Sequence, residues 1–282
     1  MAGIFGIFRL DGGGVDGAEM ASMADALEHR GPDGIETLNW GEVAMGHCAL
    51  HTTPESLHEI LPCRDSLAGL AITADARIDN RKQLASDLGI HAAETAALGD
   101  SQLILRAYGK WGEACVEHLL GDFAFAIWDE NQRKLLLARD HAGCKPLYYH
   151  SGEGLLVFAS SAKAVARVSG VGASLNEARI ADYLTELLEG GDHTCSFYNE
   201  VSRLPPAHAA SMLCSQPSSN RRSSYSGVRT AAPASMASAM RPHAAASKTR
   251  GSGPPSSSRR NAVATMPPVM LGIAGRCSDQ PR

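Results

Sequence analysis

The second residue determines what chemistry the start of this chain could perform. Met1 is followed by Ala2, which is small enough for Met1 to be removed after synthesis. A thiol or hydroxyl on the newly exposed residue could attack an electrophilic carbon while the free α-amine takes the proton. Ala2 carries only a methyl group. We therefore predict a degenerate nucleophile position that has no reacting atom.

Other candidate reactive groups have simpler interpretations. Cys48 could face a pocket, but we favour a buried thiol, because free Cys usually packs as a small hydrophobic residue. Ser22 and Thr52 offer nothing beyond a hydroxyl. The run Arg139-Asp140-His141 could be catalytic, yet we favour a tight structural turn with paired charges. We predict no metal site, because metal-ligand spacing is absent among His29, His47, His51 and His58.

Hydrophobic periodicity predicts many short strands and a few helices. Helices are expected over residues 18–27 and from Asp100-Ser101 as capping residues. A third is expected from Asn176, with Ile180, Leu184 and Leu187 or Leu188 facing inward, until Gly190-Gly191. Strands are expected over residues 3–8, 43–50, 67–74, 121–129, 134–139, 155–160 and 207–212. This mixture favours an α+β sandwich.

The composition changes after Met212. Residues 213–282 contain ten Lys and Arg residues and one acidic residue, whereas residues 1–212 contain 16 basic and 29 acidic residues. The same tail holds eight of the 14 Pro residues and 14 Ser residues. Such a segment buries too little apolar surface to offset its ordering entropy. We predict a folded domain over 1–212 and a disordered Ser/Pro/Ala/Arg-rich tail over 213–282.

The cysteines and the hydropathy indicate a compartment. The seven Cys residues are scattered and form no CxxC pair, so we expect free thiols in a reducing cytoplasm. The start of the chain lacks the pattern of a secretion signal. No apolar run reaches the length that spans a membrane. We predict a cytoplasmic protein without a membrane partner.

Several segments together resemble the glutamine amidotransferase domain that begins asparagine synthetases and their relatives, including lasso-peptide cyclases and β-lactam synthetases. They occur in the family's order and intervals, and residues 176–212 also match. The segments are His29-Arg30-Gly31-Pro32-Asp33, Gly99-Asp100-Ser101, Gly121-Asp122-Phe123-Ala124-Phe125-Ala126, Arg139 to Tyr149, and Phe158-Ala159-Ser160-Ser161-Ala162-Lys163.

The resemblance implies a fold and a reaction. The fold is a four-layer αββα sandwich of two antiparallel sheets, as in N-terminal nucleophile hydrolases. In the family this domain releases ammonia from glutamine. A second domain uses ATP and Mg²⁺ to form an amide, such as asparagine from aspartate. A synthetase domain or subunit is therefore the implied partner.

The resemblance also places the active-site positions. The nucleophilic Cys position holds Ala2, and the Arg that clamps the glutamine carboxylate falls at Ala49. The Asn-Gly-Glu segment that supplies oxyanion donors and substrate contacts aligns with Asp75-Ala76-Arg77. The Asp that holds the substrate amine is kept as Asp100.

These replacements all reduce the expected activity. Losing a nucleophile costs on the order of a millionfold in rate when catalytic residues act as a unit. Ala49 removes a bidentate carboxylate clamp, and Asp75 places an acceptor where donors are needed. We therefore predict no glutaminase activity and weak or absent glutamine binding.

The synthetase domain of this family has no recognisable counterpart in the sequence. The family's Ser-Gly-Gly-x-Asp-Ser pyrophosphate loop is missing, so we predict no ATP, Mg²⁺ or other cofactor in this chain. The match ends near Leu213, and we hypothesise a truncated chain whose reading frame has shifted there.

Three interpretations stay open from sequence. The first is an inactive fragment of an asparagine-synthetase-like enzyme. The second is a non-catalytic module that binds an amine or docks a partner through the vestigial pocket. The third is a nucleic-acid-binding basic tail, which we do not favour because Tyr225 is its only aromatic residue.

Overall fold

The computed structural model of this chain describes residues 1–152, 154–185, 192–213 and 229–230. All of them belong to one compact unit, Met1–Ala232. Most of the predicted tail, together with residues 186–191, lies outside the described residues. The exceptions are Leu213 and Arg229–Thr230, which take part in strands.

Sheet I contains six antiparallel strands. They are β1 (Gly3–Arg9), β2 (Ile35–Asn39), β3 (Val43–Cys48), β8 (Tyr148–Gly152), β9 (Leu155–Ala159) and β10 (Ser202–Arg203), in the order β10-β8-β9-β1-β3-β2. β1 lies at the centre, because Phe5 pairs with Gly46 of β3 on one side and with Ala159 of β9 on the other. The register therefore fixes the start of the chain at one end of this sheet.

Sheet II also contains six antiparallel strands. They are β4 (Cys63–Asp65), β5 (Leu70–Ile78), β6 (Gly121–Asp129), β7 (Lys134–Arg139), β11 (His208–Leu213) and β12 (Arg229–Thr230), in the order β12-β11-β7-β6-β5-β4. The β6–β7 hairpin confirms the expectation from sequence, with Asp129 paired to Lys134 across the turn. β5 continues to Ile78, beyond the predicted end at residue 74.

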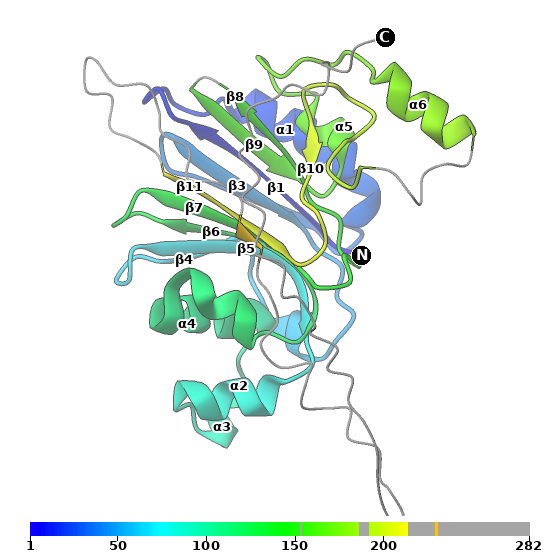
Figure 1. Cartoon of the computed structure of the whole chain (residues 1–282). Coiled ribbons are helices and arrows are strands. Elements are labelled where there is room, and N and C mark those ends of the chain that lie inside the picture. The colour runs from blue at the N-terminus through cyan, green and yellow to red at the C-terminus, as the bar shows by residue number, and fades with distance from the viewer. Residues whose placement is uncertain (153, 186–191, 214–228, 231–282) are drawn as a thin grey trace, which may run out of the picture. The chain divides into compact units, whose positions relative to one another are not determined.

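Helices cover the outer faces of both sheets (Figure 1). α1 (Gly17–Leu27) and α5 (Ala162–Val165) pack on sheet I around Phe5, Met23 and Val157. α2 (Arg81–Leu88), α3 (Ala92–Thr95) and α4 (Asp100–Trp111) lie on the side of sheet II, where Leu103 and Ile104 of α4 meet the outer face. Short 3₁₀ helices span Glu28–Arg30, Glu55–His58 and Gly112–His118. The predicted αββα sandwich is confirmed.

The two sheets pack face to face over an apolar core. Alternate residues of each strand enter it, such as Ile4 and Phe8 from β1 and Ala126 and Trp128 from β6. The Phe8 and Trp128 rings lie 5.3 Å apart across this core. Thr73 of β5 donates a hydrogen bond of 3.0 Å to the Gly46 carbonyl of β3, so the sheets are also joined through a polar contact.

Two helix predictions need correction. Asp100 begins α4 but does not cap it, because its carboxylate binds groups outside the helix; Gly99 is the N-cap residue. α6 (Glu177–Leu184) begins at the predicted Asn176 cap, whose side chain accepts from Arg179 N at 3.0 Å. Leu184, the last residue of α6, was expected to face inward but is 74% exposed, and no residue of this helix is buried. Leu187, Leu188, Gly190 and Gly191 lie outside the described residues.

Candidate functional site

Ala2 lies at the end of the sandwich where the chain enters sheet I. It directly precedes β1 and is 7% exposed. Strand alternation places it on the same face of β1 as Ile4, which packs between the sheets. The methyl group is therefore held at a defined place at the mouth of the inter-sheet core.

Asp75 of β5 lies beside this end and is 6% exposed. Lys145 Nζ donates to Asp75 Oδ1 at 2.7 Å, and the Lys145 side chain is itself only 16% exposed. Asp75 Oδ2 is buried and finds no hydrogen-bond partner among the described residues. Burial raises the pKa of Asp75, while Lys145, the amino terminus of Met1 and Arg30 act in the opposite direction. These interactions bring Asp75 and the start of the chain into one electrostatic site.

Two further side chains belong to this region: His47 of β3 and Arg30, which ends the 3₁₀ helix Glu28–Arg30. Burial, helped by the nearby His51, lowers the pKa of His47 to about 4, while a hydrogen bond with the backbone of Ala74 opposes this. His47 is therefore neutral at pH 7. Arg30 Nε is buried and has no hydrogen-bond partner within the part of the chain that is described. A neutral imidazole and a guanidinium thus lie near Asp75.

Cys48 does not supply a replacement nucleophile. It is fully buried and packs in the core between sheet I and its helices, away from the inter-sheet face. Burial raises the pKa of the Cys48 thiol to about 11, although Arg30 lowers it in part. The interpretation as a buried thiol is confirmed. The described cysteines, which exclude Cys214 and Cys277, are all free thiols.

Three more residues were assigned to the active site by resemblance, and they lie in three different environments. Ala49 follows β3 and makes backbone hydrogen bonds with Gly34 at 2.7 Å and with Asp33 at 3.2 Å. Ala76 packs in part against the helical core of sheet II. The Arg77 side chain is half exposed and pairs with Asp79 at 3.0 Å and Asp122 at 3.4 Å.

Asp100 is engaged by the chain itself. Its carboxylate accepts from Ile78 N at 3.1 Å and forms an ion pair with Arg81 Nη1. Arg81 Nη2 also donates to the Leu98 carbonyl at 2.6 Å. Burial raises the pKa of Asp100, while the Ile78 amide and Arg81 act in the opposite direction. An internal guanidinium therefore lies on the carboxylate that sequence reasoning assigned to a substrate amine.

The segment Arg139-Asp140-His141 forms a turn, as predicted, but its charges are satisfied differently. Arg139 donates to the carbonyls of Lys145, Leu204 and Gly143 at 2.6, 2.7 and 2.5 Å. Asp140 accepts from Cys144 N and Lys145 N, both at 2.9 Å. The charges bind backbone groups rather than each other. This turn is what orients Lys145 toward Asp75.

Among the described residues, one group of three potential metal ligands lies within ligand-to-ligand reach, Asp122, Asp140 and Cys144. Both oxygens of Asp140 already accept backbone N–H groups. A hydrogen bond with Asp122 raises the pKa of the Cys144 thiol, so the thiolate that a metal would need is disfavoured. These atoms hold the turn after β7.

Sequence reasoning missed Lys145 and Arg81 as members of the site. Lys145 lies 70 residues from Asp75, and Arg81 lies 19 residues from Asp100. The available signal was the pair of acidic residues that align with the site of a hydrolase. A buried carboxylate needs a cation or hydrogen-bond donors, so burial of Asp75 and Asp100 predicts a cationic partner for each.

Two solved structures share this architecture. One is the glutamine phosphoribosylpyrophosphate amidotransferase of Bacillus subtilis, with 16% identity over 75% of this chain and 47% of that chain and a TM-score of 0.50. Another is described as an allosteric regulatory enzyme of purine biosynthesis, with 17% identity, the same coverage and a TM-score of 0.52. These likenesses show that the two-sheet fold is shared.

The glutamine amidotransferase domain family matches residues 1–225. This chain therefore belongs to that family, as an N-terminal class II glutamine amidotransferase domain of the asparagine synthetase type. It is 29% identical over 193 residues to asparagine synthetase [glutamine-hydrolyzing] 3 of Bacillus subtilis, covering 67% of this chain and 31% of the relative. It is 32% identical over 163 residues to a putative asparagine synthetase of Mycobacterium tuberculosis, covering 53% and 25%.

The chain spans about a third or less of the length of these relatives. It is also 30% identical over 149 residues to the amidase chyE of Penicillium rubens, covering 51% of this chain and 21% of the relative. In the part of the chain that is described, no helix is both long enough and apolar enough to cross a membrane.

Proposed function

We propose that this chain is a non-catalytic amidotransferase domain that derives from an enzyme of ATP-dependent amide formation. Ala2 provides no nucleophile, and the ion pair between Asp75 and Lys145 fills the position where the oxyanion of an amide hydrolysis would be stabilised. An oxyanion site needs donors directed at developing negative charge, whereas Asp75 presents an oxygen acceptor. The Asp75–Lys145 contact at 2.7 Å is the observation that carries this proposal.

The positions assigned to glutamine binding have also changed in ways that weaken binding. Ala49 has no cation for a substrate carboxylate, and Arg81 already neutralises Asp100. A substrate ammonium would have to displace an internal guanidinium that also holds two carbonyls, those of Thr95 and Leu98. Glutamine binding is therefore weak or absent in this proposal.

The retained role is packing or docking. The domain keeps a two-sheet sandwich with a buried core, and its relatives are much longer chains. The partner is a synthetase domain or subunit that performs the ATP- and Mg²⁺-dependent step. In this proposal the partner holds the ATP and Mg²⁺ site, residues 1–212 release no ammonia from glutamine, and the cell compartment is the cytoplasm.

The test is ammonia release from glutamine by the purified full chain. We expect background rates for the natural chain and for Ala2→Cys, because Ala49 and Asp75 still disable the pocket. A triple variant, Ala2→Cys/Ala49→Arg/Asp75→Asn, restores the missing groups and is the informative comparison. Ammonia release by the natural chain, or by Ala2→Cys at the rate of an intact family member, would refute the proposal.

A second candidate function is amine binding without catalysis. It is favoured by one observation, that Asp75 Oδ2 and Arg30 Nε are both buried and lack partners among the described residues. A small molecule with both a donor and an acceptor would satisfy both atoms. Calorimetry against glutamine, asparagine and simple amines tests this candidate. Binding that is lost in Asp75→Asn supports it, and the absence of heat from every compound at millimolar concentration rejects it.

A further inference from the structure

Strand β5 of sheet II crosses β3 of sheet I in a direction that its side-chain contacts define. Thr73 of β5 donates a hydrogen bond of 3.0 Å to the Gly46 carbonyl of β3. The next residue of β5, Ala74, forms a backbone hydrogen bond with the side chain of His47, the next residue of β3. Asp75 therefore lies level with the last residue of β3.

The start of the chain lies at this same level. Cys48, the last residue of β3, pairs with Gly3 of β1, and Ala2 is the neighbour of Gly3 on the inter-sheet face of β1. Asp75 shares the face of β5 that carries Thr73, which reaches sheet I. Ala2 is 7% exposed and Asp75 is 6% exposed. The two residues thus face one enclosed space from opposite sheets.

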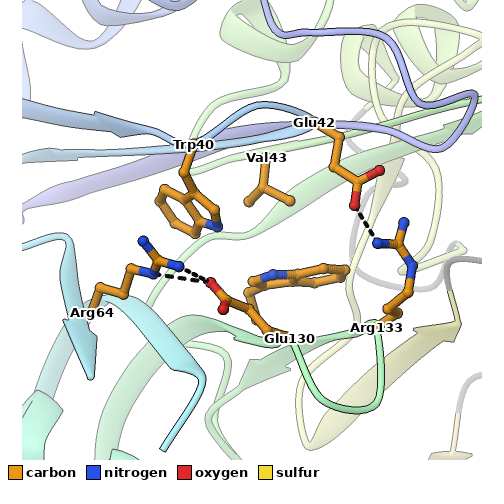
Figure 2. A pocket seen from close by; sticks show the side chains of 7 residues that line it. Trp40, Glu42, Val43, Arg64, Glu130 and Arg133 are labelled. Atoms are coloured by element: carbon orange, nitrogen blue, oxygen red, sulfur yellow. Dashed lines mark hydrogen bonds and ion pairs between the residues drawn. The ribbon is translucent and has the colours of Figure 1, made fainter. Parts of the chain in front are cut away.

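The opposite end of the sandwich shows how other carboxylates of this fold are paired (Figure 2). Glu42 lies 2.5 Å from Arg133 Nη1, and Glu130 lies 2.7 Å from Arg64 Nη2. The two glutamate side chains are 25% and 30% exposed, so water reaches the oxygens that the arginines leave free. Asp75 differs, because Lys145 binds only Oδ1 and no described residue donates to the enclosed Oδ2. Asp75 is a buried carboxylate with one unused acceptor.

The charges around Asp75 do not offset its burial. Burial raises the pKa of Asp75 by more than Lys145, the amino terminus of Met1 and Arg30 together lower it. His47 adds no charge at pH 7, because burial lowers its pKa to about 4. A further N–H donor directed at Oδ2 would stabilise the charged carboxylate.

Removal of Met1 produces such a donor. Met1 is 55% exposed and Ala2 is small, so a methionine aminopeptidase can hydrolyse the peptide bond between them. The hydroxyl of water goes to the methionine carboxyl group, which loses its proton, and the nitrogen left on Ala2 becomes an ammonium group. Free methionine leaves. The ammonium forms on a residue that already lies in the enclosed space, so no group has to enter from solvent.

We propose that removal of Met1 creates an internal ion pair between the α-ammonium of Ala2 and Asp75 Oδ2, with Lys145 retained on Oδ1. The carboxylate then has a cation on each oxygen, and the processed start of the chain is fixed to β5. Met1 removal is a maturation step that stabilises the degenerate site. This inference deepens the proposed function and rests on it, because an ammonium held by Asp75 cannot accept the proton of a nucleophile.

Four full-length chains isolate this ion pair. A cleavable fusion partner leaves either Met1 or Ala2 as the first residue, and each form is made with Asp75 and with Asp75→Asn. Urea unfolding is measured at pH 6, where an ordinary α-amine is charged. We expect removal of Met1 to lower the unfolding equilibrium constant about tenfold with Asp75 and less than about threefold with Asp75→Asn. Asp182→Asn removes a nearly half-exposed carboxylate from α6 and is the matched control, which should keep the tenfold effect.

Acylation of the α-amine gives a second measurement that needs no variant. Each native chain reacts with the N-hydroxysuccinimide ester of acetic acid at pH 7, and mass spectrometry of the N-terminal peptide gives the rate relative to the same chain in urea. We expect about tenfold protection of the Ala2 amine, the effect of one pKa unit. The Met1 amine should show little protection, because Met1 is exposed. If Asp75→Asn does not fold, this comparison decides.

Three results would overturn the proposal. The first is retention of Met1 in the chain expressed without a fusion partner. The second is an equal effect of Met1 removal with Asp75 and with Asp75→Asn. The third is an Ala2 amine that is acylated as fast in the native chain as in urea. Ammonia release from glutamine is a separate measurement, so failure of the ion pair and failure of the proposed function are distinguishable.

Discussion

Lys145 and Asp75 meet inside the sandwich at 2.7 Å, with 16% and 7% of their side chains exposed. The cation comes from the turn after β7, and the carboxylate comes from β5. The pair therefore links the turn after β7 to strand β5. Both charges of the pair are thereby compensated within the chain itself.

The first prediction concerns this pair. Lys145→Met should destabilise the fold by about 2–3 kcal/mol, because removing one partner leaves a buried carboxylate uncompensated. The double variant Asp75→Asn/Lys145→Met should recover most of that loss, because no buried charge is left behind. Urea denaturation measures both. Lys163→Met, at an exposed side chain, is the control, and a single variant as stable as this control would contradict the prediction.

The second prediction concerns Arg81. Arg81→Met removes the ion pair with Asp100 and the hydrogen bonds to the Thr95 and Leu98 carbonyls, so it should cost about 3 kcal/mol. Arg106→Met is a matched control on α4. Arg106 pairs with Glu94 at 2.7 Å, but both side chains are nearly half exposed.

An exposed pair of this kind contributes about 0–1 kcal/mol. Thermal or urea unfolding should therefore separate the two arginine variants by at least about 2 kcal/mol, as expected for a buried against an exposed pair. Equal losses in both variants would show that Asp100 does not depend on Arg81.

The third prediction concerns pH. Burial lowers the pKa of His47 to about 4, below its unfolded value near 6.5. A depressed folded pKa means that the unfolded chain takes up a proton first as the pH falls. The contribution of His47 is thus fully present above about pH 6.5 and is lost progressively toward pH 4, with a limit of about 3 kcal/mol.

The measurement is the unfolding free energy of the natural chain and of His47→Gln from pH 7.5 to 4. The variant should show a shallower loss on acidification over that window. His29→Gln, at an exposed side chain, is the control and should follow the natural curve. Parallel curves for His47→Gln and the natural chain would show that this imidazole titrates as it does in water.

The fourth prediction concerns the thiols. Cys48 and Cys115 are fully buried, and burial raises their pKa values to about 11 and about 12. Alkylation of the native chain at pH 8 should leave both unmodified while the exposed Cys144 reacts. Peptide mapping by mass spectrometry reads out each site, and alkylation in denaturant gives the full-labelling reference. Early modification of Cys48 in the native chain would show that its thiol is accessible and reactive, and would contradict the prediction.

Elements with a strong local pattern could be predicted from the sequence. The hairpin of β6 and β7 has apolar strands bounded by polar turn residues, and α4 carries its apolar residues at helical spacing. The edge strand β2, Ile35–Asn39, was missed because most of its side chains are exposed, so no buried face imposes an alternating pattern. β8 was missed for a related reason, since Tyr148 and Tyr149 are only partly buried.

The site could be predicted only at its aligned positions. Ala2, Ala49, Asp75 and Asp100 were assigned by resemblance, and these assignments stay predictions; of the four, only Asp100 lies within a quoted matching segment. The cations on the two carboxylates could not, because contacts between distant segments depend on how the sheets and loops fold together. The electrostatic state of the site is therefore a property of the fold rather than of any local motif.

The placement of β1 between β3 and β9 has a consequence for the timing of assembly. On one side β1 pairs with residues 43–48, which the ribosome delivers soon afterwards, but on the other it pairs with residues 155–159. Until that later segment emerges, one edge of a largely apolar strand is open to pairing with other nascent chains. The growing polypeptide is thus most vulnerable to misassembly before β9 is made, and a chaperone that shields β1 during that interval would raise the yield of native protein.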